Sequence, residues 1–286
     1  MKTVRKTVVT TSVAASSVVK RAPFVAGQKL GTAELLFRSA QDMGLRPNWV
    51  IPNGLFAVLV NDQEHYVNFA RSPLNSHTSA SLARDKYLTR RILERHHLPN
   101  IPFARPVSPA DAASFLRQYG KIIAKPVSGS GAHDIRIITA VRQLQALDIT
   151  KYILEKYIAG QELRYLVLNG TVIGVHRSSY GTSVKEDRPL QRISYHPSVW
   201  DAVLVSSAIQ VARILGLRFA AVDYLIDASG QAYILEVNTA PGLKWFHAPT
   251  SGPPIDVARQ FLEAIFKDSE NDAGGIPIAR QGSSRS

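Results

Sequence analysis

Hydrophobic and polar residues follow two periods along the chain, and together these periods predict a mixed α/β (α+β) fold. Apolar residues recur every three to four positions in some segments, as on a helix face, and every second position in others, as in a strand. The helical period predicts helices over 32–43, 84–96, 141–147, 199–215 and 254–266. Alternating or short apolar runs predict strands over 49–51, 55–60, 66–69, 121–127, 135–139, 152–158, 162–168, 171–177, 219–227 and 231–237.

Turn-forming residues join several of these predicted strands into hairpins. Asn53-Gly54 and Asn169-Gly170 are dipeptides that favour tight hairpin turns. A third turn, over 227–230, joins the last two predicted strands. Antiparallel pairing about this turn brings residues whose numbers sum to roughly 459 opposite each other. Asp223 and Glu236 are therefore expected to be close cross-strand neighbours.

The last predicted strand ends in two side chains that carry oxygen. Glu236 and Asn238 are two residues apart, so they point to the same face of a strand. With Asp223 across the hairpin they form a set of hard oxygen donors, which suits a divalent cation such as Mg²⁺. Two close carboxylates repel each other unless a cation lies between them. Two alternatives remain open, which are ordinary solvated strand ends and a carboxylate paired with Arg218 or Lys244.

A glycine-rich loop follows the predicted strand that carries Lys125. The loop contains Ser128, Gly129, Ser130 and Gly131. Small residues let backbone N–H groups approach a phosphate closely, and a lysine nearby supplies the compensating positive charge. This segment is not a P-loop, because no Gly-Lys-Ser/Thr sequence opens a helix after it. The alternative interpretation is a flexible hairpin with an exposed lysine.

The composition of the chain excludes several classes of protein. Its 286 residues are 45% hydrophobic, which is enough to form a sizeable core. No stretch approaches about 20 uninterrupted apolar residues, so we expect no membrane-spanning helix. The absence of cysteine excludes disulfides, thiolate nucleophiles and zinc–thiolate sites. This composition fits a cytoplasmic protein, although residues 1–22 have the character of a disordered or organelle-targeting arm.

The net charge of +12 is distributed unevenly along the chain. Residues 1–33 contain six Lys or Arg and no acid, whereas 267–286 contain three basic and three acidic residues. The remaining excess is scattered through the middle without a run of like charges, so nucleic acid is not an expected partner. The polar, Gly- and Ser-rich composition of 267–286 predicts a disordered tail.

Nine features follow one another along the chain, namely Lys86, Lys125, the glycine-rich loop after it, Glu155-Lys156-Tyr157-Ile158, Glu162, Arg177, Asp223, Glu236 and Asn238. Taken in this order, they resemble the ATP-grasp superfamily. The resemblance covers about residues 74–266 and is greatest to the branch that contains glutathione synthetases, cyanophycin synthetases, ribosomal-protein glutamate ligases and D-alanine–D-alanine ligases. The segments ARDKYLTRRIL and LEVNTAPGL carry its most specific part.

The resemblance implies an ATP-grasp fold, in which two α/β lobes grip ATP. It implies an ATP-grasp domain over 74–266, a lid subdomain over about 100–158 within it, and a short α/β region over 23–73 before it. The implied nucleotide contacts are Lys86 and Lys125 with the α- and β-phosphates, Ser128 to Gly131 over the β- and γ-phosphates, Glu155, Lys156 and Ile158 at the adenine edge, and Glu162 at the ribose.

The resemblance also implies a metal site and a reaction. Asp223, Glu236 and Asn238 would hold two Mg²⁺ ions, with Mn²⁺ as a possible substitute, and Arg177 and Lys125 would have catalytic roles. A carboxylate would attack the γ-phosphate to give an acylphosphate and ADP, and an amine would then displace phosphate. The expected substrates are amino acids, other small molecules or peptides, and a homo-oligomer is conceivable.

Two departures from the family pattern concern the substrates. Ala221 stands where D-alanine–D-alanine ligases have an arginine, and the segment 178–198 lacks the Asn and paired glycines that often follow Arg177 in the related branch. His176 alternates with Arg177 and is expected to be a packing or surface residue. The alternative function is an ATP-binding regulatory or scaffold protein that has the ATP-grasp fold and no ligase activity.

Overall fold

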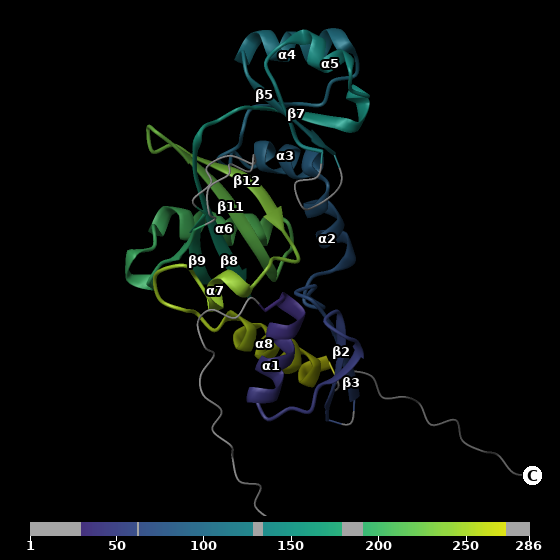
Figure 1. Ribbon diagram of the computed structural model, residues 1–286, viewed down its shortest axis with the longest axis vertical. Helices are drawn as coiled ribbons and strands as arrows, with labels where there is room; N and C mark the ends of the chain where they lie inside the picture. The colour runs from purple at the N-terminus through teal and green to yellow at the C-terminus, as the bar shows by residue number, and fades with distance from the viewer. Residues whose placement is uncertain (1–29, 62, 128–133, 179–190, 273–286) are drawn as a thin grey trace, which may run out of the picture.

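The computed structural model describes residues 30–61, 63–127, 134–178 and 191–272. Three antiparallel sheets follow one another along the long axis of the molecule, each with helices packed beside it (Figure 1). The described residues form the helix-and-antiparallel-sheet arrangement expected of an α+β fold. No helix among them is long and apolar enough to cross a lipid bilayer.

The middle sheet has five strands in the order β10-β9-β8-β11-β12. Its strands are β8 (Gly160–Leu168), β9 (Thr171–Ser178), β10 (Arg192–Ser194), β11 (Phe219–Asp227) and β12 (Ala232–Asn238). Asn169 and Gly170 connect β8 to β9 with φ of 47° and 75°, so the predicted hairpin turn is confirmed. Asp223 lies directly opposite Glu236, which confirms the predicted register of the last hairpin.

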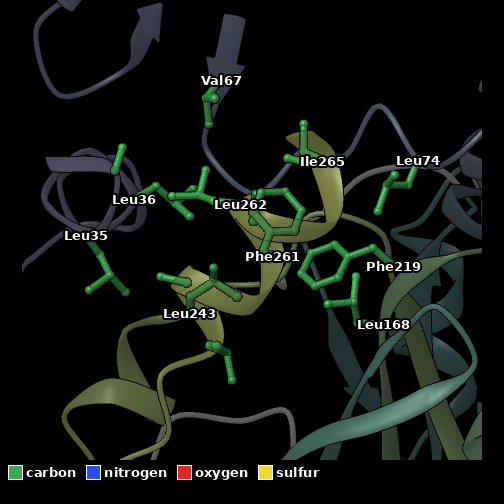
Figure 2. Packing of buried hydrophobic residues seen from close by; sticks show 14 of the residues in the cluster. Leu35, Leu36, Val67, Leu74, Leu168, Phe219, Leu243, Phe261, Leu262 and Ile265 are labelled. Atoms are coloured by element: carbon green, nitrogen blue, oxygen red, sulfur yellow. The ribbon is translucent and has the colours of Figure 1, made fainter. Parts of the chain in front are cut away.

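The two faces of the middle sheet bury different cores. One face packs against α6 (Ala202–Ile214), with the side chains of Val222 and Tyr224 among the buried residues. The other face packs against α7 (Lys244–His247) and α8 (Val257–Asp272), which contact Leu166 and Phe219 through Phe246 and Phe261. These last residues belong to the core that Figure 2 shows in part.

The lower sheet shares its core with α8 instead of forming a separate one. It consists of β1 (Asn48–Ile51), β2 (Leu55–Val60) and β3 (Gln63–Asn68), with α1 (Thr32–Asp42) beside it. Leu36 of α1 and Val67 of β3 meet Leu262 of α8 in one apolar cluster that extends to Phe219 of the middle sheet (Figure 2). The described part of the predicted 23–73 region is therefore joined to the middle sheet by a continuous core.

The upper sheet has four strands in the order β4-β7-β5-β6 and a hydrophobic core of its own. The strands are β4 (Phe103–Ala104), β5 (Ile122–Pro126), β6 (Arg136–Ile138) and β7 (Tyr152–Lys156); α4 (Pro109–Tyr119), α5 (Val141–Gln145) and a 3₁₀ turn (Ile149–Lys151) accompany them. Two helices, α2 (His77–Arg84) and α3 (Lys86–Arg95), lie between the upper sheet and the two other sheets (Figure 1).

Three expectations from the sequence differ from the structure. The helix predicted over 84–96 is interrupted at Asp85, whose extended backbone ends α2 and whose side chain caps α3. Neither α2 nor α4 was predicted. The prediction of a disordered tail from residue 267 is wrong for 267–272, which continue α8. The predicted arm 1–22 and residues 273–286 lie outside the described residues.

Candidate nucleotide and metal site

A pocket lies where the middle and upper sheets face each other across α2 and α3. It brings together Lys86, Glu155, Glu236 and Asn238, four of the residues predicted to bind the nucleotide or metal. The full lining is Ala83, Arg84, Lys86, Thr89, Arg90, Glu155, Ile234, Leu235, Glu236, Val237, Asn238 and Thr239. The predicted loop residues Ser128, Gly129, Ser130 and Gly131 lie outside the described residues.

Lys86 owes its position to the break between α2 and α3. The Asp85 carboxylate accepts a hydrogen bond from the Leu88 N–H at 2.9 Å, so α3 begins with Lys86 as its first residue. The backbone N–H of Lys86 donates to the carbonyl of Val127 at 3.0 Å, which links the start of α3 to the end of β5. Burial lowers the pKa of Lys86, whereas the nearby Glu236 carboxylate raises it.

Lys125 belongs to a buried group of three charged side chains. Its ammonium lies 2.7 Å from Oε2 of Glu155, and the Arg90 guanidinium lies 2.7 Å from Oε1 of the same carboxylate. The exposed fractions of Lys125, Glu155 and Arg90 are 4%, 1% and 3%. Burial alone raises the pKa of Glu155, but the two cations outweigh it and bring the pKa down to about 2. The Glu155 carboxylate is thus held ionised between two positive charges.

The predicted metal ligands surround an arginine that the sequence analysis did not identify. Arg164 donates to both oxygens of Asp223, each at 2.6 Å, and lies 3.9 Å from Glu236. The register explains this contact, because Asp223 has Arg164 of β8 on one side and Glu236 of β12 on the other. The suggested pairing of a carboxylate with Arg218 or Lys244 is wrong for Asp223, whose partner is Arg164.

Carboxylates outnumber cations around Arg164. The Glu236 side chain is 47% accessible because it lines the open pocket. Burial raises the pKa of Glu236, and the adjacent Asp223 raises it further. Burial likewise raises the pKa of Glu162 to about 7, again with a contribution from Asp223. A further cation would relieve both effects.

The donor set therefore fits a hard cation such as Mg²⁺. Carboxylate and amide oxygens are the ligands that this ion prefers. The described residues contain no cluster of three or more His, Cys, Asp or Glu side chains that could hold a metal ion. The fit consequently depends on the amide of Asn238 together with Asp223 and Glu236. The Asn238 side-chain oxygen accepts the Ala240 N–H at 2.9 Å, which fixes the orientation of the amide.

The predicted adenine edge lies at the end of β7. Lys156 donates its backbone N–H to the Pro102 carbonyl at 2.9 Å, so this group is already used within the protein. The Ile158 side chain is buried against Ile101 and Leu225. The reading of a base by the backbone at Lys156 and Ile158 stays a prediction.

Arg177 lies on the opposite face of the middle sheet from the carboxylates. It pairs with Leu163 of β8, whereas its neighbour His176 pairs with Arg164. This placement does not bring Arg177 to the site where the resemblance implied a catalytic arginine. His176 is 1% exposed and its ring packs against Phe246 at 4.7 Å, so it is a packing residue, as the alternation suggested.

A β-bulge causes this reversal of faces. The hairpin starts with Leu168 opposite Thr171 and Val167 opposite Val172, but the next pair joins Leu166 to Gly174. One extra residue in β9 exchanges the faces of every residue after it. Without the bulge, the same turn would place Arg177 opposite Glu162.

Arg192 is a second arginine on the carboxylate side that the sequence analysis missed. It pairs with Ser178 of β9, two residues beyond His176, and therefore shares the face of Arg164. Burial lowers the pKa of Arg192, while the nearby Glu162 raises it. No strand was predicted at 192–194, so no sequence signal placed Arg192. The Glu162-x-Arg164 alternation within one predicted strand could have placed Arg164 beside the metal ligands.

A family model described as a RimK-like ATP-grasp domain matches residues 83–265. A "Probable alpha-L-glutamate ligase" from Shewanella pealeana is 26% identical over 219 residues, covering 71% of this chain and 46% of the relative. A "D-alanine--D-alanine ligase" from Ectopseudomonas mendocina is 30% identical over 181 residues, or 58% of each chain. The chain spans about half the length of the first of these relatives.

The fold is similar to that of solved ATP-grasp enzymes. The crystal structure of a bifunctional glutathione synthetase from Pasteurella multocida superposes with a TM-score of 0.62 at 13% identity. The match covers 84% of this chain and 44% of that one. At this level of identity the likeness concerns the fold alone.

Proposed function

Because the chain belongs to the RimK-like ATP-grasp family, we propose that it is an ATP-dependent carboxylate–amine ligase that releases ADP and phosphate. One observation carries the proposal. Lys86, the Lys125–Glu155 pair and the oxygen donors Glu236 and Asn238 come from four separate elements and converge on one pocket region. A cation-rich side and a carboxylate-rich side facing each other suit a triphosphate with its metal ions.

The residues of the pocket divide the work of the first step. Lys86 and Lys125 bind phosphate oxygens, and Asp223, Glu236 and Asn238 would hold two Mg²⁺ ions, with Mn²⁺ able to replace them. When bound, the ions would neutralise part of the phosphate charge. A substrate carboxylate oxygen attacks the γ-phosphorus, the bond to the β,γ-bridging oxygen breaks, and ADP leaves with that oxygen.

The second step transfers the acyl group to an amine. The amine nitrogen attacks the acyl carbon, inorganic phosphate leaves, and the nitrogen loses a proton to give an amide. Arg164 and Arg192 take the charge-stabilising role that the sequence analysis gave to Arg177, because they lie on the carboxylate side of the sheet. No step requires a covalent bond to the protein.

Amino acids or peptides are the substrates that we propose. This choice rests on the relatives named as α-L-glutamate and D-alanine–D-alanine ligases. The cytoplasmic location and the homo-oligomer suggested by the sequence stay predictions.

A turnover screen with two variants tests the proposal. We expect ADP formation to require both a carboxylate and an amine when amino acids and dipeptides are screened with Mg·ATP. Glu236→Ala is expected to abolish ADP formation without unfolding the protein, since the side chain is 47% accessible. Glu263→Ala is the matched control, because Glu263 is 52% accessible and its ion-pair partner is Arg259 of the same helix, α8.

Two results would contradict ligation. Unchanged ADP formation in Glu236→Ala would remove the metal ligand from the mechanism. Binding of Mg·ATP without turnover against the whole panel would favour the regulatory or scaffold function instead.

A further inference from the structure

We propose that Arg90 is a positioning residue that aligns the two halves of the Mg·ATP site, so that the lysine half and the carboxylate half hold one nucleotide together. The inference rests on the proposed function and concerns the same site. In this proposal Arg90 itself binds neither phosphate nor metal. It acts through Glu155 on the upper sheet and through β12 of the middle sheet.

The contacts of Arg90 span both sheets. Its Nε donates to Oε1 of Glu155 at 2.8 Å, and Glu155 in turn holds the Lys125 ammonium at 2.7 Å. Its two terminal nitrogens donate to the backbone carbonyls of Ile234 and Leu235 in β12. One planar guanidinium therefore connects the carboxylate that orients Lys125 to the strand segment immediately before Glu236.

The place of β12 in the sheet makes this connection effective. β12 is the last strand of the five, so its outer edge has no neighbouring strand among the described residues. Arg90 occupies part of that edge, and the Ile234 N–H donates to the Pro99 carbonyl at 3.1 Å beside it. Strand edges present unpaired carbonyl groups that can accept such donors. The Arg90 guanidinium thus fixes the position of Glu236 relative to the upper sheet.

Because Arg90 shares the Glu155 carboxylate, the positive charge of Lys125 is only partly neutralised and can attract a phosphate. A lone buried Lys–Glu pair has no net charge, and the carboxylate would compete with a phosphate for the ammonium. In this group two cations share one carboxylate, so the net charge is positive. Asn100 holds Arg90 in place, since its side chain accepts from Arg90 at 3.0 Å and donates to the Arg90 carbonyl at 2.9 Å.

Arg90→Lys separates charge from geometry. The substitution keeps the positive charge and removes the planar fork that reaches Glu155 and β12 together. The probe is ADP, titrated by calorimetry with excess Mg²⁺ and again with a chelator. In the wild type we expect Mg²⁺ to tighten ADP binding, because both halves grip the same phosphates. In Arg90→Lys we expect the increase in ADP affinity caused by Mg²⁺ to be about tenfold smaller than in the wild type. The ADP affinity without Mg²⁺ should change much less.

Arg91→Lys is the matched control. Arg91 is the next residue on α3, is 58% accessible and pairs with Glu94 of the same helix at 2.8 Å, so its gain from Mg²⁺ should equal that of the wild type. Asn100→Ala is a milder second variant that keeps the guanidinium and removes one of its anchors. If Arg90→Lys does not fold, Asn100→Ala replaces it, and the gain in ADP affinity from Mg²⁺ should again be smaller than in the wild type.

The outcomes separate this inference from the proposed function. A wild-type protein that binds no ADP with or without Mg²⁺ would contradict the proposed function. A wild-type gain from Mg²⁺ that persists in Arg90→Lys and Asn100→Ala would overturn the positioning role alone. Equal losses of ADP affinity with and without Mg²⁺ would also overturn it, because a general structural defect gives that result.

Discussion

The two charged groups that face the pocket have opposite balances of charge. At the upper sheet, Lys125 of β5 and Arg90 of the adjacent helix α3 share the single carboxylate of Glu155, whose pKa falls to about 2. On the middle sheet, carboxylates gather around Arg164, and the pKa of Glu162 rises to about 7. The group around Glu155 therefore has an excess of cations, and the group around Arg164 has an excess of carboxylates.

Under the proposed function, this difference suits a ligand that carries both signs of charge. A triphosphate is an anion, and its metal ions are cations, so complementary surfaces need opposite charge on either side. On the cation-rich side, ion pairs with Glu155 hold Arg90 and Lys125 in place. The carboxylate-rich side holds like charges together, a cost that bound cations would relieve. The upper sheet thus contributes preorganised cations to the pocket, and the middle sheet contributes carboxylates that repel one another.

The largest expected effect comes from breaking the central pair on the middle sheet. Arg164→Met leaves the Asp223 carboxylate, which is 0% exposed, without its partner. Loss of one member of a buried pair typically destabilises a protein by about 3–5 kcal/mol, measurable by urea unfolding. Arg259→Met, which removes an exposed pair with Glu263, should stay within about 0.5 kcal/mol of the wild type. Equal effects of the two substitutions would show that Arg164 does not offset the carboxylates.

The next effect concerns the upper sheet and depends on pH. The pKa of Glu155 is about 2 in the folded protein against 4.5 as its ordinary value, so its stabilising effect is present above pH 4.5 and is lost as pH falls toward 2. Glu155→Gln should therefore be less stable than the wild type by about 3 kcal/mol at neutral pH. The gap should narrow below pH 4.5 in urea titrations; a constant gap would contradict the ionised, doubly paired carboxylate.

The smallest effect has the opposite sign and comes from Glu162. A raised pKa means that its stabilising, protonated form prevails at low pH and is lost as pH rises through about 7. Glu162→Gln resembles the protonated form. Because Glu162 is partly exposed, solvent screening reduces the effect to about 1 kcal/mol, so without Mg²⁺ the melting temperature should rise by about 2–4 °C at pH 8 and change little at pH 5. A lower melting temperature at pH 8 would show that the carboxylate-rich side is not strained.

The sequence predicted local pairing well, because turns and registers depend on nearby residues. The 227–230 turn was sufficient to place Asp223 opposite Glu236. The sequence also predicted the α+β fold, and the resemblance to ATP-grasp proteins is confirmed by the family match. The helix predicted over 84–96 corresponds to α3, but its start was placed two residues too early, because Arg84 ends the unpredicted helix α2 and Asp85 caps α3.

The arginines were harder to predict for a physical reason. Which of His176 and Arg177 faces Asp223 depends on one bulged residue in β9, and alternation in the sequence does not reveal a bulge. The resemblance supplied an arginine at this strand without supplying its face. Arg90 was not identified because its partners, Glu155 and β12, are more than 60 residues away along the chain.

The bulge in β9 also has an evolutionary consequence. Loss of a single codon at the bulge would exchange the faces of His176 and Arg177, since the register shift lies between them and the Asn169-Gly170 turn. The shortest genetic path between a histidine and an arginine at this position on the carboxylate face of the middle sheet is thus a deletion, with no amino-acid replacement at either position. Lineages that differ by one residue in this hairpin would differ in the chemistry they present to a substrate.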